Sequence, residues 1–507
     1  MTIQNLSINS LQRLAGRLVV VFFSLLFYGV PAASQTGVHV PELALFDAKM
    51  NGMLAKYNIA GGQLAISYQG RLVYSRGFGY ADTVDKSVVQ PNSIFRLASV
   101  SKSITSIAIM KLYEQGLLHL DDTVLGKGGI LNDSQYQNAI DPRMYQFTVR
   151  QLLNHSSGLS FDFATDPLYK TYDIAIAMGV PPPTYSFPLV LQWTMLHHSL
   201  AFTPGTSAFY SNDGYIVLGL IIEKITGKKY EAYVKESILL PLGITDMYAG
   251  KSLQKDKYPG EVSYYDYPGA PLSTSFLTGV PASVPAQYGG YNWEIMTPAG
   301  GWVASAQDLC KLLLSVDTYN SRPDILQPNT IDTMTTKSVN WPDYGLGWFV
   351  TADEIYHTGG IQGTASIIRA NKNKQLTYAI IFNALPQNYT PLYNEFMSLV
   401  SDEYPNITSW PSHDLFAPTG VTSARASKQE IEIFPNPAKN YITISNLPAS
   451  FSGSITVTNM AGQEVFYQVI SDYKTVINTE DIPVGVYSVI IHSNIDGGVT
   501  TKKFVKY

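Results

Sequence analysis

Ser99 and Lys102 lie three residues apart at the start of an apolar helical pattern that runs to about Glu114. This spacing brings both side chains to one face of a helix, one turn apart. A lysine that is shielded from water beside the positive end of a helix dipole can stay neutral and accept the serine proton. The pattern therefore predicts a nucleophile, Ser99, with its base. A serine-capped helix with a solvated lysine fits the same residues, so the rest of the chain must decide.

A second segment, Tyr210-Ser211-Asn212, precedes another helical pattern. A phenol close to an ammonium group has a lowered pKa and can pass a proton to a leaving group. An asparagine amide can hydrogen-bond the acyl part of a substrate. Tyr-x-Asn taken alone is also typical of a turn.

A third segment, His357-Thr358-Gly359-Gly360, stands ahead of a predicted strand. Glycines there would let a substrate lie along the edge of the strand, and a backbone N–H could face a developing oxyanion. This segment, too, is typical of a turn when it is considered alone.

The elements that must position these residues begin and end with strands. Helices are predicted for residues 40–58, 99–114, 149–154, 214–226, 306–316 and 392–400, a hairpin for 62–80 with Gln69-Gly70 at its turn, and strands for 345–350, 365–370 and 376–383. This order predicts one sheet whose terminal segments meet around a helical middle. Residues 161–188 and 258–293 lack periodicity and are interpreted as walls of a cleft or, equally, as surface loops.

The three segments, in this order, resemble the serine β-lactamase and penicillin-binding protein superfamily, in the branch of class C β-lactamases, D-Ala-D-Ala carboxypeptidases and related esterases and amidases. The resemblance covers about residues 40–405 and extends to residues 95–98, 152–158, 298–302 and 344–348. It implies an α+β fold with a β-lactamase/transpeptidase-like antiparallel sheet flanked by helices, plus a helical region. The chain lacks the Gly-x-Ser-x-Gly motif of α/β-hydrolases.

The chemistry that this resemblance implies is acyl transfer, with the backbone N–H groups of Ser99 and Gly360 holding the oxyanion. His155 and Ser156 are expected to be structural. No cofactor and no metal are expected, because the single cysteine, Cys310, lies in an apolar helical pattern and the eight histidines form no His-Glu-x-x-His motif. The implied catalytic residues are Ser99, Lys102 and Tyr210, and the implied substrate-binding residues are Asn212, His357, Thr358, Gly359 and Gly360.

His357 departs from the class C β-lactamases, which usually carry lysine at this position; a histidine there resembles D,D-peptidases and several esterase-like relatives. Histidine is only partly charged at neutral pH, so binding of a substrate carboxylate is expected to be weak and to fall as the pH rises past about 6.5. The sequence therefore does not predict efficient destruction of β-lactam antibiotics.

The two ends of the chain carry targeting signals. Residues 1–34 combine arginines, a short apolar run and small residues, which predicts a signal peptide, with an uncleaved anchor as the alternative. Residues 35–416 form the predicted hydrolase domain. Residues 417–430 are rich in small and polar residues, which predicts a linker. The 507-residue chain has a net charge of -5 and no basic cluster, so nucleic acid is not expected as a partner.

Residues 431–507 contain short β-rich runs that predict a small β-sandwich. Phe434-Pro-Asn-Pro-Ala438, Asn459-Met-Ala-Gly-Gln463 and Pro483-Val-Gly-Val-Tyr487 resemble the C-terminal sorting domain of type IX secretion. The resemblance implies the type IX secretion machinery as a partner and export through the periplasm to the cell surface or the medium. No stable transmembrane span is expected after signal cleavage, because no other segment of the sequence is apolar over the length of a span. An ordinary β-sandwich binding module is the alternative.

Together these features predict a secreted serine hydrolase that cleaves an amide or ester in a small-molecule or peptide substrate. D-amino-acid peptides, β-lactams, small esters and cyclic or oligomeric amides all remain open, so a carboxylesterase or an amide-oligomer hydrolase is an alternative within the same fold. A non-catalytic ligand-binding surface protein is the alternative from another class.

Overall fold

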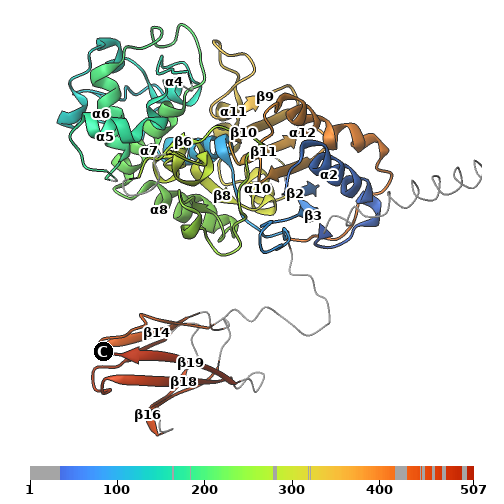
Figure 1. Cartoon of the computed structure of the whole chain (residues 1–507), viewed down its shortest axis with the longest axis vertical. Helices are drawn as coiled ribbons and strands as arrows, with labels where there is room; N and C mark the ends of the chain where they lie inside the picture. Colours follow the sequence, from blue (N-terminus) through green and yellow to red (C-terminus); the bar gives the residue numbers. More distant parts are fainter. Residues whose placement is uncertain are drawn as a thin grey trace, which may run out of the picture. The chain divides into compact units, whose positions relative to one another are not determined.

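The computed structural model describes residues 35–162, 165–182, 184–277, 283–317, 319, 321–416, 431–445, 447, 452–459, 463–470, 475–493 and 499–507. These residues form two compact units, one that ends with residue 416 and one that begins with residue 431 (Figure 1). The predicted signal peptide, residues 1–34, and the predicted linker, residues 417–430, lie outside the described residues.

The first unit is built on an antiparallel sheet that joins the two ends of the domain. Its described strands follow the order β1 (Gln35–Thr36), β3 (Arg71–Gly79), β2 (Gly61–Tyr68), β12 (Leu376–Phe382), β11 (Thr364–Asn371), β10 (Glu354–Ile361) and β9 (Phe349–Val350). Ala65 of β2 pairs with Ala379 of β12, more than 300 residues later in the chain. The prediction that the terminal segments share one sheet is confirmed.

The β2–β3 hairpin turns at Gln69 and Gly70, as predicted. Their φ angles are 51° and 76°, so both residues occupy the left-handed region. Two-residue turns with positive φ at both positions match the right-handed twist of the flanking strands. The turn therefore aligns β2 and β3 along their length.

Helices cover both faces of this sheet (Figure 1). On one face, α2 (Ala44–Tyr57) and α12 (Thr390–Glu403) share an apolar cluster with the strands, in which the rings of Phe382 and Phe396 lie 5.1 Å apart. On the other face, α10 (Ala306–Leu313) packs against β2 and β12. Its buried Cys310 donates to the Ala65 carbonyl, which confirms its interpretation as a core residue.

The remaining part of the first unit is mainly helical. Its central helix, α3 (Ser101–Glu114), is buried at every position from Ser101 to Met110, because other elements surround it. A small sheet has the strand order β4 (Phe95–Arg96), β8 (Trp302–Ala304) and β5 (Tyr248–Ala249). In the chain, β4 comes before α3, and β5 and β8 come after it. The other helices and strands described here are α4 (Val149–Leu153), α5 (Thr171–Ala177), α6 (Phe187–His197), α7 (Asn212–Thr226), α8 (Tyr230–Val234), α9 (Trp293–Met296), α11 (Pro328–Thr335), β6 (Ser273–Thr274) and β7 (Ser283–Val284).

Two sequence interpretations need correction. Residues 161–188 are not irregular throughout, because they contain α5 and the start of α6, which are short helices stabilised by packing rather than by an amphipathic pattern. His357, Thr358, Gly359 and Gly360 lie within strand β10, not ahead of a strand. Glycines weaken the sequence signal of a strand, and pairing with β11 along its whole length imposes the conformation.

The second unit consists of two antiparallel sheets. One contains β13 (Glu432–Phe434), β14 (Tyr441–Ser445) and β17 (Thr475–Asn478); the other contains β16 (Glu464–Ile470), β15 (Gly453–Asn459), β18 (Gly485–Ser493) and β19 (Val499–Lys506). Ile444 from the first sheet and Val457 and Phe504 from the second belong to one apolar core. This packing confirms the predicted α+β fold with a C-terminal β-sandwich.

Candidate active site

Ser99 lies in a 3-10 turn, η2 (Ala98–Val100), directly before α3. Ala98 has a φ of 47°, a left-handed conformation that a residue with a Cβ rarely adopts. Neighbouring elements hold this turn, because the Leu97 N–H donates to the Trp302 carbonyl at 2.9 Å. The strained turn leaves Ser99 half-buried at the edge of a cavity.

Lys102 is fully buried one helical turn after Ser99. Its Nζ lies 2.8 Å from Asn212 Oδ1, 2.7 Å from the Ala299 carbonyl oxygen and 3.4 Å from Ser99 Oγ. Ala299 belongs to a π-helical turn, η10 (Thr297–Gly301), a geometry that frees carbonyl groups from regular helical bonds. All three neighbours of the amine are uncharged, so no carboxylate of the described residues forms a direct ion pair with Lys102.

Burial lowers the pKa of Lys102 to about 7, while the carboxyl groups of Asp166 and Asp213 act in the opposite direction. Transfer of an ammonium group out of water disfavours its charged form, which is why the pKa falls. Near neutral pH the amine is therefore present in comparable amounts as a base and as an acid. This is the property that removal of a serine proton requires.

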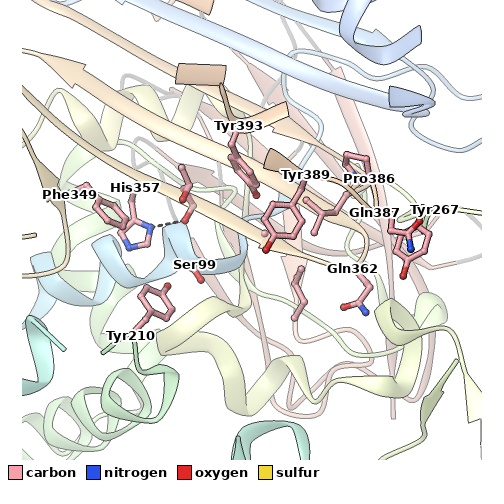
Figure 2. Close-up of a pocket in the computed structure, with 14 residues that line it drawn as sticks. Ser99, Tyr210, Tyr267, Phe349, His357, Gln362, Pro386, Gln387, Tyr389 and Tyr393 are labelled. Atoms are coloured by element: carbon pink, nitrogen blue, oxygen red, sulfur yellow. Dashed lines mark hydrogen bonds between the residues drawn. The ribbon is translucent and has the colours of Figure 1, made fainter. Parts of the chain in front are cut away.

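Tyr210 lines the same cavity as Ser99 (Figure 2). Lys102 Nζ is 4.7 Å from the centre of the Tyr210 ring. The centre of the His155 ring lies 4.5 Å from the centre of the same tyrosine ring. Burial raises the pKa of Tyr210, and the nearby Ser99 hydroxyl offsets part of the rise. The expected lowering of this pKa by lysine is wrong, because desolvation of the phenolate outweighs the attraction of a partly neutral amine.

A buried carboxyl pair lies behind Lys102, and the sequence analysis missed it. Asn212 Nδ2 donates to Asp166 Oδ2 at 3.0 Å, so Asn212 connects the carboxyl to the lysine amine. Burial raises the pKa of Asp166 and of Asp213, and their mutual repulsion adds to the rise for Asp213. The only sequence signal is Asp166 before a proline, which indicates a helix cap, and Asp166 does accept from the Leu168 N–H.

A chain of hydrogen bonds connects the Tyr210 segment to β10. The Ser211 N–H donates to His155 Nδ1 at 3.1 Å, and His155 Nε2 lies 3.3 Å from the Tyr344 hydroxyl. That hydroxyl lies 3.1 Å from His357 Nε2, and His357 Nδ1 donates to the Thr358 carbonyl at 2.7 Å. Because the Ser211 N–H donates to His155 Nδ1, the proton of His155 is on Nε2, which donates to the Tyr344 hydroxyl. The Tyr344 hydroxyl in turn donates to His357 Nε2, since the proton of His357 is on Nδ1. Both histidines are therefore neutral. His155 is thus bonded on both sides, and its expected structural role stays a prediction.

His357 is buried, and its charge state differs from the expected one. Burial lowers its pKa to about 3, and the nearby Lys102 amine lowers it further. The sequence-based expectation of a partly charged histidine that responds to pH near 6.5 is therefore wrong, because a buried imidazole with both nitrogens hydrogen-bonded stays neutral. Its role as a substrate-binding residue stays a prediction.

Gly359 makes the closest contact between β10 and the Ser99 turn. A Cβ on Gly359 would lie 2.2 Å from the Leu97 oxygen, 2.4 Å from Ser366 Oγ and 3.1 Å from the Ser99 nitrogen. No larger residue fits this contact without moving the strand or the turn. The Gly359 carbonyl accepts from the Tyr393 hydroxyl at 2.5 Å.

The edge of β10 beyond this contact is open. β9 pairs with β10 only at Ile355 and Tyr356, so no strand within the described part of the chain covers residues 357–361 on that side. Gly360 is exposed there and lines the cavity. An extended substrate backbone could lie along this edge, next to the Ser99 N–H.

The cavity that these elements enclose has a volume of about 580 Å³ (Figure 2). Of the predicted site residues, Ser99, Tyr210, His357, Thr358 and Gly360 line it. Lys102, Asn212 and Gly359 are not part of the lining. Lys102 contacts Ser99, Asn212 contacts Lys102, and Gly359 contacts the Ser99 turn. The other residues that line it are Tyr267, Phe349, Ile361, Gln362, Leu385, Pro386, Gln387, Tyr389 and Tyr393.

The family described as Beta-lactamase matches residues 46–397, which include every residue of this site. The chain belongs to the β-lactamase family. A second match, described as "Secretion system C-terminal sorting domain", covers residues 432–507, so the β-sandwich of this β-lactamase family member is a type IX sorting domain.

The chain is similar to "Protein flp" of Staphylococcus aureus (strain COL), with 26% identity over 351 residues that cover 68% of this chain and 64% of that protein. It is also similar to "Penicillin-binding protein 4*" of Bacillus subtilis (strain 168), with 31% identity over 204 residues, 39% of each chain. It therefore spans less than two thirds of the length of these relatives. The D-amino acid amidase of Ochrobactrum anthropi SV3 shares the fold, with a TM-score of 0.56, 21% identity, and coverage of 72% of this chain and 99% of that one.

The buried amine predicts the pH dependence of this β-lactamase family site. We expect kcat/KM for an uncharged ester to be low below the Lys102 pKa and to rise to a plateau above it, because only the neutral amine accepts a proton. Asp166→Asn should move the midpoint to lower pH, because the Asp166 carboxyl raises the pKa of Lys102. Asp173→Asn, at an exposed position in α5, is the control. A rate independent of pH between about 5 and 9 would contradict this assignment of the base.

The close contact at Gly359 predicts a local loss of function. Gly359→Ala should lower kcat/KM by about 100-fold, the effect of losing one oxyanion donor, because the new Cβ pushes β10 away from the Ser99 N–H. Gly52→Ala in α2 is the matched control, since no atom lies within 4 Å of its Cβ, and it should leave turnover unchanged. Full activity of a folded Gly359→Ala protein would show that the strand position is not needed.

Proposed function

We propose that this protein is an exported serine hydrolase that cleaves an amide or ester bond through an acyl-enzyme on Ser99. The observation that carries the proposal is the position of the fully buried Lys102 amine, 3.4 Å from the Ser99 hydroxyl, beside a cavity that Tyr210 also lines. A buried lysine without a carboxylate in direct contact costs stability, so its presence is favoured by chemistry rather than by folding.

Acylation would begin with attack of Ser99 Oγ on the substrate carbonyl carbon while the hydroxyl proton moves to Lys102 Nζ. The carbonyl electron pair moves onto oxygen, where the N–H groups of Ser99 and Gly360 would stabilise the anion. Collapse of this intermediate breaks the bond to the leaving group. Tyr210, which keeps its proton because burial raises its pKa, would donate that proton to the leaving group and regain one from Lys102.

Deacylation would repeat these steps with water as the nucleophile. Lys102 Nζ accepts a proton from the water, the hydroxide adds to the acyl carbon, and the bond to Ser99 Oγ breaks as Oγ regains a proton. Asn212 keeps the amine in place through both halves, because its amide is itself held by Asp166. The released acid and the free serine complete the cycle.

The sorting domain supports export of the hydrolase domain by the type IX secretion machinery to the cell surface or the medium. The predicted signal peptide at residues 1–34 would first deliver the chain to the periplasm. Within the described residues, no helix has both the length and the apolar character that crossing a bilayer requires.

A covalent label tests the nucleophile. We expect a fluorescent penicillin or an activated ester to add its acyl mass to the peptide that contains Ser99, and Ser99→Ala to abolish the adduct. Lys102→Ala should slow acylation by about 1,000-fold, within the usual contribution of a general base. Ser87→Ala, at an exposed position, is the matched serine control.

Two outcomes would overturn this function. If folded protein carries no adduct on Ser99 with either reagent, Ser99 is not the nucleophile. If the parent protein binds ligands without turnover, and Lys102→Ala binds them equally well, the chain is a binding protein that keeps the fold of the family.

A further inference from the structure

Among the described residues, no charged side chain lines the cavity around Ser99. His357, which lines the cavity, has both nitrogens occupied, one by the Thr358 carbonyl and one by the Tyr344 hydroxyl. The Lys102 amine is likewise engaged by three neighbours beneath the cavity floor. None of these groups can pair with a substrate carboxylate without breaking the hydrogen bonds of the site.

The wall beside Ser99 is mainly aromatic and aliphatic. Tyr389 and Tyr393 lie on the same side of Ser99, and Tyr267 and Pro386 continue this side away from it (Figure 2). The rings of Tyr389 and Tyr393 meet edge to face, 6.0 Å apart at 80°, and Tyr389 is 51% exposed. Apolar surface held open to water in a cavity favours an apolar ligand.

Apart from the tyrosine hydroxyls, the polar side chains that reach this wall are neutral amides. Gln362 Oε1 already accepts from the Tyr291 hydroxyl, so its NH₂ group is the part that can donate to a substrate carbonyl. Gln387 is exposed and lines the cavity. Recognition by such groups fixes the orientation of an uncharged substrate and offers nothing to balance a negative charge.

We propose that this site selects uncharged esters or amides that carry an aromatic or large apolar group, and that it discriminates against substrates that bring a carboxylate into the cavity. The proposal rests on the function proposed for Ser99, since it names the substrate class of the same site. A carboxylate that enters would lose hydration without gaining a cation, whereas a phenyl or alkyl group would bury apolar surface against Tyr389 and Pro386.

Two pairs of 4-nitrophenyl esters with a common leaving group test this selectivity. The first pair is the pentanoate and the glutarate monoester, which differ mainly in a terminal carboxylate. We expect kcat/KM to be at least about tenfold higher for the pentanoate. The second pair is the phenylacetate and the acetate, with the phenylacetate favoured by about tenfold. The first ratio should persist in 0.5 M NaCl, which screens the net charge of -5 but not a contact inside the cavity.

Variants at the wall connect these ratios to named residues. Gln387→Lys should raise the ratio of kcat/KM for the glutarate monoester to kcat/KM for the pentanoate by about tenfold, because the lysine supplies a cation in the cavity. Gln115→Lys, an exposed position at the end of α3 away from the cavity, is the matched control and should leave the ratio unchanged. Tyr389→Ala should lower the phenylacetate-to-acetate ratio about fivefold, and Tyr389→Phe should keep it.

The outcomes separate this proposal from the function on which it rests. If Ser99→Ala removes all turnover but the glutarate monoester reacts as fast as the pentanoate, the selectivity is overturned and the serine hydrolase stands. If ester turnover survives Ser99→Ala, or if no ester reacts and Ser99 takes no label, the function itself falls. A selectivity that disappears in 0.5 M NaCl overturns the cavity as its origin.

Discussion

Burial of one amine organises the candidate active site. Lys102 Nζ is removed from water and surrounded by uncharged oxygens from Asn212, Ala299 and Ser99, so its pKa falls to about 7. Every other feature of the site preserves that environment. The π-helical turn presents the Ala299 carbonyl to the amine. The carboxyl of Asp166 does not contact the amine directly, because Asn212 lies between the two groups. A carboxylate in direct contact with Lys102 would keep the amine protonated and remove the base.

The same preference for neutral groups extends to the wall of the cavity. His155, Tyr344 and His357 form a hydrogen-bonded chain in which both imidazoles stay uncharged, and this chain connects the segment of Tyr210 to strand β10. Its members therefore position Tyr210, the proposed proton donor, and the strand edge relative to each other. A charge anywhere in this chain would lie close to the Lys102 amine and change its proton affinity.

Much of the fold follows from local patterns in the chain. The hairpin at residues 61–79 could be predicted from alternation and from Gln69-Gly70, and α3 from its apolar run after Ser99. The C-terminal sandwich could be predicted from its short alternating strands. Elements that depend on packing could not be predicted in this way. α5 and α6 lack an amphipathic pattern. β10 contains two glycines, which weaken the sequence signal of a strand, and its conformation depends on pairing with β11.

The sequence by itself determined which groups are available. They are a serine and a lysine one helical turn apart, a tyrosine with an asparagine two residues later, and a glycine-rich segment, in an order typical of one family. Only the tertiary structure decided their charges. Desolvation depends on every element that surrounds a group, so the low pKa of Lys102, the protonated Tyr210, the neutral His357 and the carboxyl pair of Asp166 and Asp213 have no signature in local sequence.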